Sequence, residues 1–143
     1  MKILWVNVCA HEVSRTLELS REFIGKYCEK HSVEVEIEEI RLFEEKNLDL
    51  FDWERVTGLS FYYDANGIPK GLSRADKLLY ITTSGGPVKD KDMGYEYISG
   101  CAKMLGIYET KRLAAEGLDV LQWDGSAILQ KAKLCAAELA KTW

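Results

Sequence analysis

The sequence has few of the segments that mark membrane or secreted proteins. No run approaches the roughly 20 consecutive apolar residues that a helix needs to cross a bilayer. The N-terminal stretch MKILWVNVCAHE has a short apolar run, but no small-residue cleavage pattern follows it. These absences predict a soluble cytoplasmic protein with no membrane partner.

Paired cysteines and basic runs are also absent. The four cysteines, Cys9, Cys28, Cys101 and Cys135, lie far apart without C-x-x-C spacing, which argues against a zinc site or a disulfide framework. Three of them fall on apolar faces, which favours buried packing. Charged residues make up 29% of the chain and the net charge is -4, so the basic footprint of a nucleic-acid binder is missing. A small anionic ligand would therefore have to be bound by local dipoles and not by a basic surface.

What the sequence does contain is enough apolar material for one domain over residues 1–143, because 47% of the chain is hydrophobic. Residues 2–8 are nearly all apolar, which predicts a strand covered on both faces. Residues 14–31 have helical spacing, with Ser14 as a candidate N-cap. Residues 33–40 alternate strictly between apolar and acidic, which predicts a half-covered strand near a sheet edge.

The alternation fails between Arg41 and Ala75 and resumes after that segment. The expected elements are a buried strand at 78–82, a helix at 93–105 closed by Gly106, a short strand at 111–115 and a helix at 124–143. Before these elements, Asn66-Gly67 predicts a hairpin. Alternating strands and helices predict an open α/β sheet with right-handed crossovers.

Apolar periodicity predicts which side chains face inward. The expected inward positions are Leu17, Phe23, Ile24, Tyr27 and Cys28 in the first helix, Val33, Val35 and Ile37 in the second strand, Met93, Tyr97, Ile98, Cys101 and Leu105 in the second helix, and Leu129, Ala132, Ala136, Leu139 and Ala140 in the last.

The loop after the first strand is a candidate anion site. Open α/β sheets bind ligands beyond the carboxyl ends of their strands. Ser14 and Thr16 place two hydroxyls where a helix begins, with Arg15 between them, and free N–H groups and the helix dipole could help to hold a phosphate. The alternative is an ordinary Ser N-cap. His11, in the same loop, could bind an anion or shuttle protons, or be plain polar surface.

The stretch after strand 78–82 is a second candidate. Thr83, Ser84, Gly85 and Gly86 combine hydroxyls with bare backbone, which lets a flat or charged ligand approach closely. A plain Gly-rich turn is the alternative. The stretch is neither a G-x-G-x-x-G fingerprint nor a P-loop, and the G-x-S-x-G of a hydrolase nucleophile elbow is absent.

An ordered series of motifs in residues 55–120 resembles the flavodoxin-like NAD(P)H-dependent oxidoreductases of the azoreductase and quinone-reductase type. The series is Gly58, SFYY at 60–63, Gly67 to Leu72, TSGG at 83–86, Gly106-Ile107 and Ala115-Glu116-Gly117. The N-terminal KILWVNVCAHEVSRTLEL also looks like the first strand and phosphate loop of that family.

The resemblance implies a flavodoxin-like parallel sheet with helices on both faces. It also implies FMN as cofactor, NAD(P)H as co-substrate, a quinone, azo or nitro acceptor, and a homodimer. By position, Ser14, Arg15 and Thr16 would hold the phosphate of FMN, and Cys9 and His11 would belong to the same cofactor loop. Thr83, Ser84, Gly85 and Gly86 would meet the ring. No side chain need act as acid or base and no metal is implied, because the flavin carries the chemistry.

One departure from the family pattern concerns the third strand. The family carries a further parallel strand, a Pro-x-Tyr/Trp loop and a helix before the segment matched by SFYY. Here only LFEEKNLDL lies between Arg41 and FDWERVTG, which predicts a sheet one strand short. A flavin-free structural or interaction module is therefore the alternative function.

Overall fold

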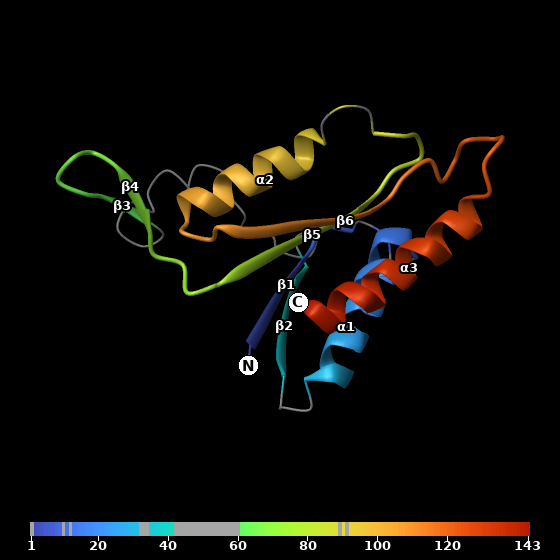
Figure 1. Ribbon diagram of the computed structural model, residues 1–143, viewed down its shortest axis with the longest axis horizontal. Coiled ribbons are helices and arrows are strands. Elements are labelled where there is room, and N and C mark those ends of the chain that lie inside the picture. Colours follow the sequence, from blue (N-terminus) through green and yellow to red (C-terminus); the bar gives the residue numbers. More distant parts are fainter. Residues whose placement is uncertain are drawn as a thin grey trace. The chain divides into compact units, whose positions relative to one another are not determined.

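The computed structural model describes residues 2–9, 11, 13–31, 35–41, 61–88, 90 and 92–143 (Figure 1). The chain forms two compact units. The first comprises Met1–Asn47, Ile81–Pro87 and Leu113–Trp143, and the second comprises Leu48–Tyr80 and Val88–Arg112. The departure predicted between Arg41 and Phe51 falls mostly outside the described residues.

The first unit contains a parallel strand pair and two long helices. Strand β1 (Lys2–Asn7) pairs in parallel with β2 (Glu36–Arg41), with Ile3 opposite Ile37. Helices α1 (Arg15–Lys30) and α3 (Gly125–Thr142) lie side by side (Figure 1). The predicted order of strand, helix and strand is confirmed here, although Val33 lies outside the described residues.

The packing of α1 and α3 follows from their buried faces. Leu17, Phe23 and Tyr27 of α1 are buried as predicted. The buried residues of α3 are small alanines at four-residue spacing: Ala132, Ala136 and Ala140. Small side chains along one face allow a second helix to come close.

Strand β1 differs from its prediction. Leu4 and Val6 are 56% and 49% exposed, so only alternate side chains are covered. Ile37, predicted to face inward from β2, is exposed as well. Within the described ranges β1 bonds to β2 alone and no second layer covers Leu4 and Val6. The prediction of two covered faces was therefore wrong for these residues.

The second unit contains the predicted hairpin. Strands β3 (Phe61–Tyr63) and β4 (Pro69–Gly71) pair antiparallel. Gly67 has a φ of 74°, which suits a turn, and the Asp64 carboxylate accepts the amides of Asn66 and Ile68 at 2.9 and 3.0 Å.

Helix α2 (Met93–Met104) ends as predicted but buries a different face. Gly106, with a φ of 92°, follows its last turn. Met93 and Tyr97 are 74% and 72% exposed, whereas Ser99 and Ala102 are buried.

A polar cluster accounts for the buried face of α2. The hydroxyl of Tyr95 donates to the Thr110 carbonyl at 3.1 Å, and the hydroxyl of Ser99 lies 3.2 Å from that of Thr110. Hydrogen bonds therefore favour a face that apolar periodicity could not identify.

Strands β5 (Lys77–Thr83) and β6 (Glu109–Ala115) pair with each other and end in the first unit. Strand β5 is half-buried along most of its length, less than predicted. In the described part of the chain no helix is long and apolar enough to cross a membrane. The alternation of strands and helices confirms the predicted α/β class.

Candidate functional site

Three segments converge at one place in the first unit: the start of α1, the turn at residues 83–86 after β5, and the loop at residues 116–119 after β6. The hydroxyls of Thr16 and Thr83 lie 2.7 Å apart, which joins the start of α1 to the turn. These two residues are 67 positions apart in the chain. The two loops proposed from the sequence are therefore neighbours.

The turn is bonded through its backbone to the loop after β6. The amide of Leu118 donates to the Ser84 carbonyl at 3.1 Å, and that of Asp119 donates to the Gly85 carbonyl at 2.9 Å. A third bond runs from the Gly117 amide to the Gly86 carbonyl at 3.2 Å. A ladder of this kind holds the turn in a defined conformation.

The start of α1 has a neutral cap. The Ser14 hydroxyl oxygen accepts from the Leu17 amide at 3.4 Å, and the hydroxyl lies 3.4 Å from Cys9 Sγ. The first amides of a helix have no intrahelical acceptor, and the helix dipole makes this end positive. The first turn of α1 can therefore accept an anion as well as being capped by Ser14.

Asn7 supports this loop and was missed by sequence reasoning. It is buried, and its Oδ1 accepts the Cys9 amide at 3.0 Å while its Nδ2 donates to Glu39 Oε1 at 2.8 Å. The hydrogen bond from Asn7 is the largest cause that lowers the pKa of Glu39 below its ordinary value. A polar residue at the end of an apolar strand was the available signal.

Asp119 was also missed. Its two carboxylate oxygens accept from Arg15 Nη1 and Nη2 at 2.9 and 3.1 Å. The hydrogen bond from Arg15 is the main cause that lowers the pKa of Asp119 and, reciprocally, raises that of Arg15. Nothing in the local sequence distinguishes this aspartate from an ordinary loop residue.

The surroundings of His11 and Ser84 differ from those of the other predicted site residues. His11 is exposed and makes no hydrogen bond or ion pair with another described residue. Ser84 donates its hydroxyl proton to the Gly86 carbonyl at 2.7 Å, within its own turn. This hydroxyl has no histidine base among the described residues, so the geometry gives no support to a hydrolase built on Ser84.

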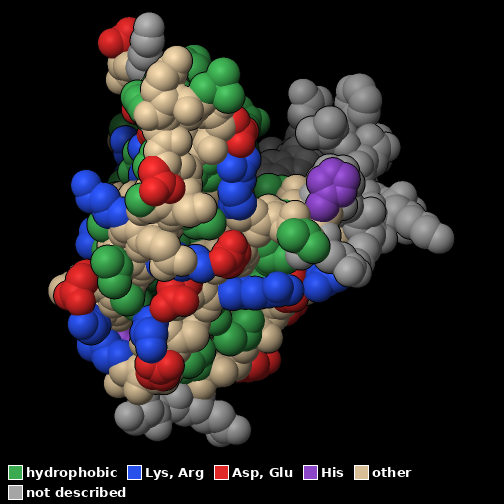
Figure 2. Space-filling view, turned by 90° about the vertical axis from the view of Figure 1, so that its right-hand side faces the viewer, with side chains coloured by type: hydrophobic (Ala, Val, Ile, Leu, Met, Phe, Trp, Pro, Cys, Tyr) green, Lys and Arg blue, Asp and Glu red, His purple; other side chains and the backbone are tan. Residues whose placement is uncertain are grey.

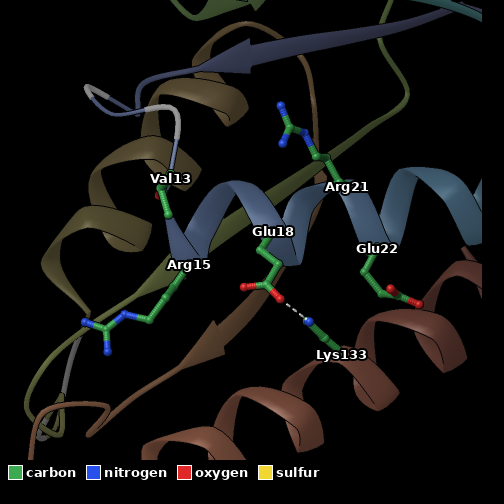
Figure 3. Close-up of a pocket in the computed structure, with 7 residues that line it drawn as sticks. Val13, Arg15, Glu18, Arg21, Glu22 and Lys133 are labelled. Atoms are coloured by element: carbon green, nitrogen blue, oxygen red, sulfur yellow. Dashed lines mark hydrogen bonds and ion pairs between the residues drawn. The ribbon is translucent and has the colours of Figure 1, made fainter.

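A pocket of about 510 Å³ lies beside the start of α1 (Figure 3). It is lined by Val13, Ser14, Arg15, Glu18, Arg21, Glu22 and Lys133. Lys133 of α3 pairs with Glu18 of α1 across it. Because basic and acidic side chains share this lining, the pocket is not specific for an anion.

Charges are also mixed on the wider surface. On the face drawn in Figure 2, Lys and Arg side chains are interspersed with Asp and Glu, and neither sign forms a continuous patch there. Among the described residues, no three His, Cys, Asp or Glu side chains converge to hold a metal ion.

The chain is similar in sequence to curated bacterial enzymes, although no family model matches it. It is 33% identical over 93 residues to an FMN-dependent NADH:quinone oxidoreductase of Lachnoclostridium phytofermentans, covering 64% of this chain and 46% of that enzyme. It is 34% identical over 95 residues to FMN-dependent NADH:quinone oxidoreductase 2 of Clostridium acetobutylicum, covering 63% and 47%. The chain thus spans about half the length of the curated relatives it matches.

Solved structures of azoreductases share its fold. Azoreductase AzrA aligns with a TM-score of 0.77 over 100% of both chains at 16% identity. An FMN-dependent NADH-azoreductase from Bacillus anthracis, solved in complex with FMN, aligns with a TM-score of 0.77 over 99% of this chain and 98% of that one at 19% identity. None of these comparisons favours a flavin-free module. This chain therefore has the flavodoxin-like fold of the azoreductases and is related in sequence to the FMN-dependent NADH:quinone oxidoreductases.

Proposed function

We propose that this chain binds FMN and passes hydride from NADH or NADPH, by way of the flavin, to a quinone, azo or nitro acceptor. The observation that carries the proposal is the contact between Thr16 and Thr83, 2.7 Å apart, which joins a helix start suited to phosphate to a Gly-rich turn suited to a flat ring. The FMN-dependent relatives and the FMN-bound structural neighbour support the same cofactor.

The start of α1 fits the phosphate of FMN. Ser14 and Thr16 carry hydroxyls there, and the amides of the first helical turn can donate to phosphate oxygens. The N-cap of this helix is uncharged, so no fixed carboxylate at that position opposes a phosphate. Cys9, His11 and Arg15 belong to the same proposed cofactor site.

The turn of Thr83, Ser84, Gly85 and Gly86 fits the ring. A Cβ placed on Gly86 would meet nothing within 4 Å, so open space adjoins the backbone at this position. Planar rings can approach bare backbone closely, and neighbouring amides and carbonyls can hydrogen-bond to ring edges. When bound, the flavin supplies hydride transfer, so the residues of this chain bind and orient it and no side chain is proposed as catalytic.

We also propose that the chain forms one flavodoxin-like domain over residues 1–143 that works as a cytoplasmic homodimer. All four cysteines are free, which suits a reducing compartment. The exposed Met93 and Tyr97 on α2 supply apolar surface of the kind that a subunit contact buries. Light scattering of the purified chain, with FMN and without it, measures the oligomeric state.

The proposed activity is tested by adding FMN to the purified chain. We expect quenching of flavin fluorescence with a saturable Kd, and FMN-dependent NADH oxidation with 2-methyl-1,4-naphthoquinone as acceptor. Glu29→Gln, an exposed change in the last turn of α1, serves as a matched control and should behave like wild type. A folded protein that neither quenches FMN fluorescence nor gains thermal stability from FMN would overturn the proposal.

A further inference from the structure

Arg15 is turned toward the loop after β6. Its side chain leaves the first turn of α1 and extends away from Arg21, as Figure 3 shows. Both terminal nitrogens are engaged by the carboxylate of Asp119, at 2.9 and 3.1 Å. The pair joins residues 104 positions apart, so it connects two segments that the chain itself does not hold together.

Two N–H donors of the Arg15 guanidinium are therefore already bonded to Asp119. A bidentate arginine–carboxylate pair is both stronger and more directional than a single contact. A phosphate that used the same two nitrogens would have to displace Asp119 first. The Ser14 and Thr16 hydroxyls and the first amides of α1 take no part in this pair, so a phosphate can bind to them without breaking it.

Asp119 also lies against the turn at residues 83–86. Its amide donates to the Gly85 carbonyl at 2.9 Å. A Cβ on Gly85 would lie 2.5 Å from Asp119 Oδ2, so the absence of a side chain at Gly85 leaves room for the carboxylate that Arg15 binds. The start of α1, Asp119 and Gly85 thus form one contact group.

We propose that Arg15 and Asp119 form a clamp that positions the Gly85 turn for the flavin ring, and that Arg15 is a positioning residue and not a phosphate ligand. This inference rests on the proposed FMN function and specifies the role of two residues within its site. Exposed ion pairs contribute little to overall stability. The clamp acts instead on the local geometry of the turn and of the loop that is bonded to it.

Binding of FMN and riboflavin separates the two roles of Arg15, because riboflavin carries the same ring without the phosphate. We expect Arg15→Met and Asp119→Asn to weaken both ligands alike, by about two- to fivefold, the range that an exposed ion pair can supply. The double variant should bind no more weakly than either single variant, because one interaction is lost in all three. Lys26→Met, which breaks the exposed Lys26–Glu29 pair on the same helix, should leave both affinities unchanged.

The opposite pattern would overturn the clamp. If Arg15→Met weakened FMN alone while riboflavin binding and the Asp119→Asn variant stayed at wild-type values, Arg15 would be a phosphate ligand. Unchanged binding of both ligands in both single variants would also contradict the inference.

Hydrogen exchange of the flavin-free protein supplies a readout that does not depend on the proposed function. We expect faster exchange of the Leu118 and Asp119 amides in Arg15→Met, because these amides bond to the turn. The charge-swapped double variant Arg15→Asp with Asp119→Arg should restore part of the protection. Wild-type exchange in Arg15→Met would contradict the clamp even if no flavin bound to any variant.

Discussion

The N-cap residues of helices α1 and α2 differ in charge. Ser14 caps α1 with an uncharged hydroxyl, and the amides of that first turn lie beside the turn at residues 83–86. Asp92 caps α2 with a carboxylate that accepts the Tyr95 amide at 3.0 Å. Arg112 also donates to this carboxylate, at 2.6 Å.

The difference determines which helix start can take an anionic ligand. A helix N-terminus carries partial positive charge, but a carboxylate at the N-cap neutralises it and repels a second anion. Asp124 caps α3 in the same way, accepting the Ala127 amide at 2.9 Å. Among the helices in the described residues, α1 alone has a neutral cap, which is why the phosphate is assigned to it.

The largest expected effect comes from giving α1 the type of cap that α2 has. Ser14→Asp should weaken FMN binding on the order of 100-fold, because like charges roughly 4 Å apart near a protein surface repel by a few kcal/mol. Thermal stability should change little, since Asp and Ser are comparable caps. Fluorescence titration measures the Kd.

Ser14→Asn is the matched variant, because it keeps a neutral cap. It should lose much less FMN affinity than Ser14→Asp. Riboflavin, which lacks the phosphate, should bind Ser14→Asp almost as well as it binds wild type. If Ser14→Asp and Ser14→Asn bound FMN equally tightly, the phosphate of FMN could not lie at the start of α1.

A smaller effect is expected at the start of α2. Asp92→Ala removes the cap and should lower the free energy of unfolding by about 1 kcal/mol, while FMN affinity stays unchanged. Asp92→Ser should recover part of this loss because a hydroxyl can also cap. Urea unfolding measures the stability, and a large loss of FMN affinity in Asp92→Ala would contradict the contrast between the two helix starts.

The smallest effect concerns pH. The hydrogen bond from the Tyr95 amide is the largest cause that lowers the pKa of Asp92 below its ordinary value of 3.8. A carboxyl whose folded pKa lies below its unfolded pKa adds stability above the unfolded pKa and loses it as pH falls through the folded pKa. Wild type should therefore lose stability more steeply than Asp92→Asn as pH falls below about 4, as urea unfolding at several pH values would show. If the free energy of unfolding depended on pH in the same way in wild type and in Asp92→Asn, the charge of Asp92 would contribute nothing to stability.

Much of the local structure could be predicted because its causes are close in sequence. The Ser14 cap, the Asn66-Gly67 hairpin and the end of α2 before Gly106 each depend on residues within a few positions. The candidate loops were found for a similar reason, because hydroxyls and glycines stand where elements begin or end.

The faces of the elements were less predictable. Apolar spacing placed Met93 and Tyr97 inward, but hydrogen bonds from Tyr95 and Ser99 to Thr110 fix another face of α2. The apolar content of β1 predicted a strand covered on both faces, whereas Leu4 is exposed. Periodicity shows that a face exists, but the partners of that face lie elsewhere in the chain.

The sequence by itself determined the order of strands and helices, the neutral cap of α1 and the glycines after β5, because these depend on short-range sterics and hydrogen bonds. Only the tertiary structure decided that Thr16 meets Thr83 and that Arg15 pairs with Asp119, across 67 and 104 positions of chain. Contacts at such separations depend on how strands and helices pack, and that packing brings together side chains that no local pattern connects.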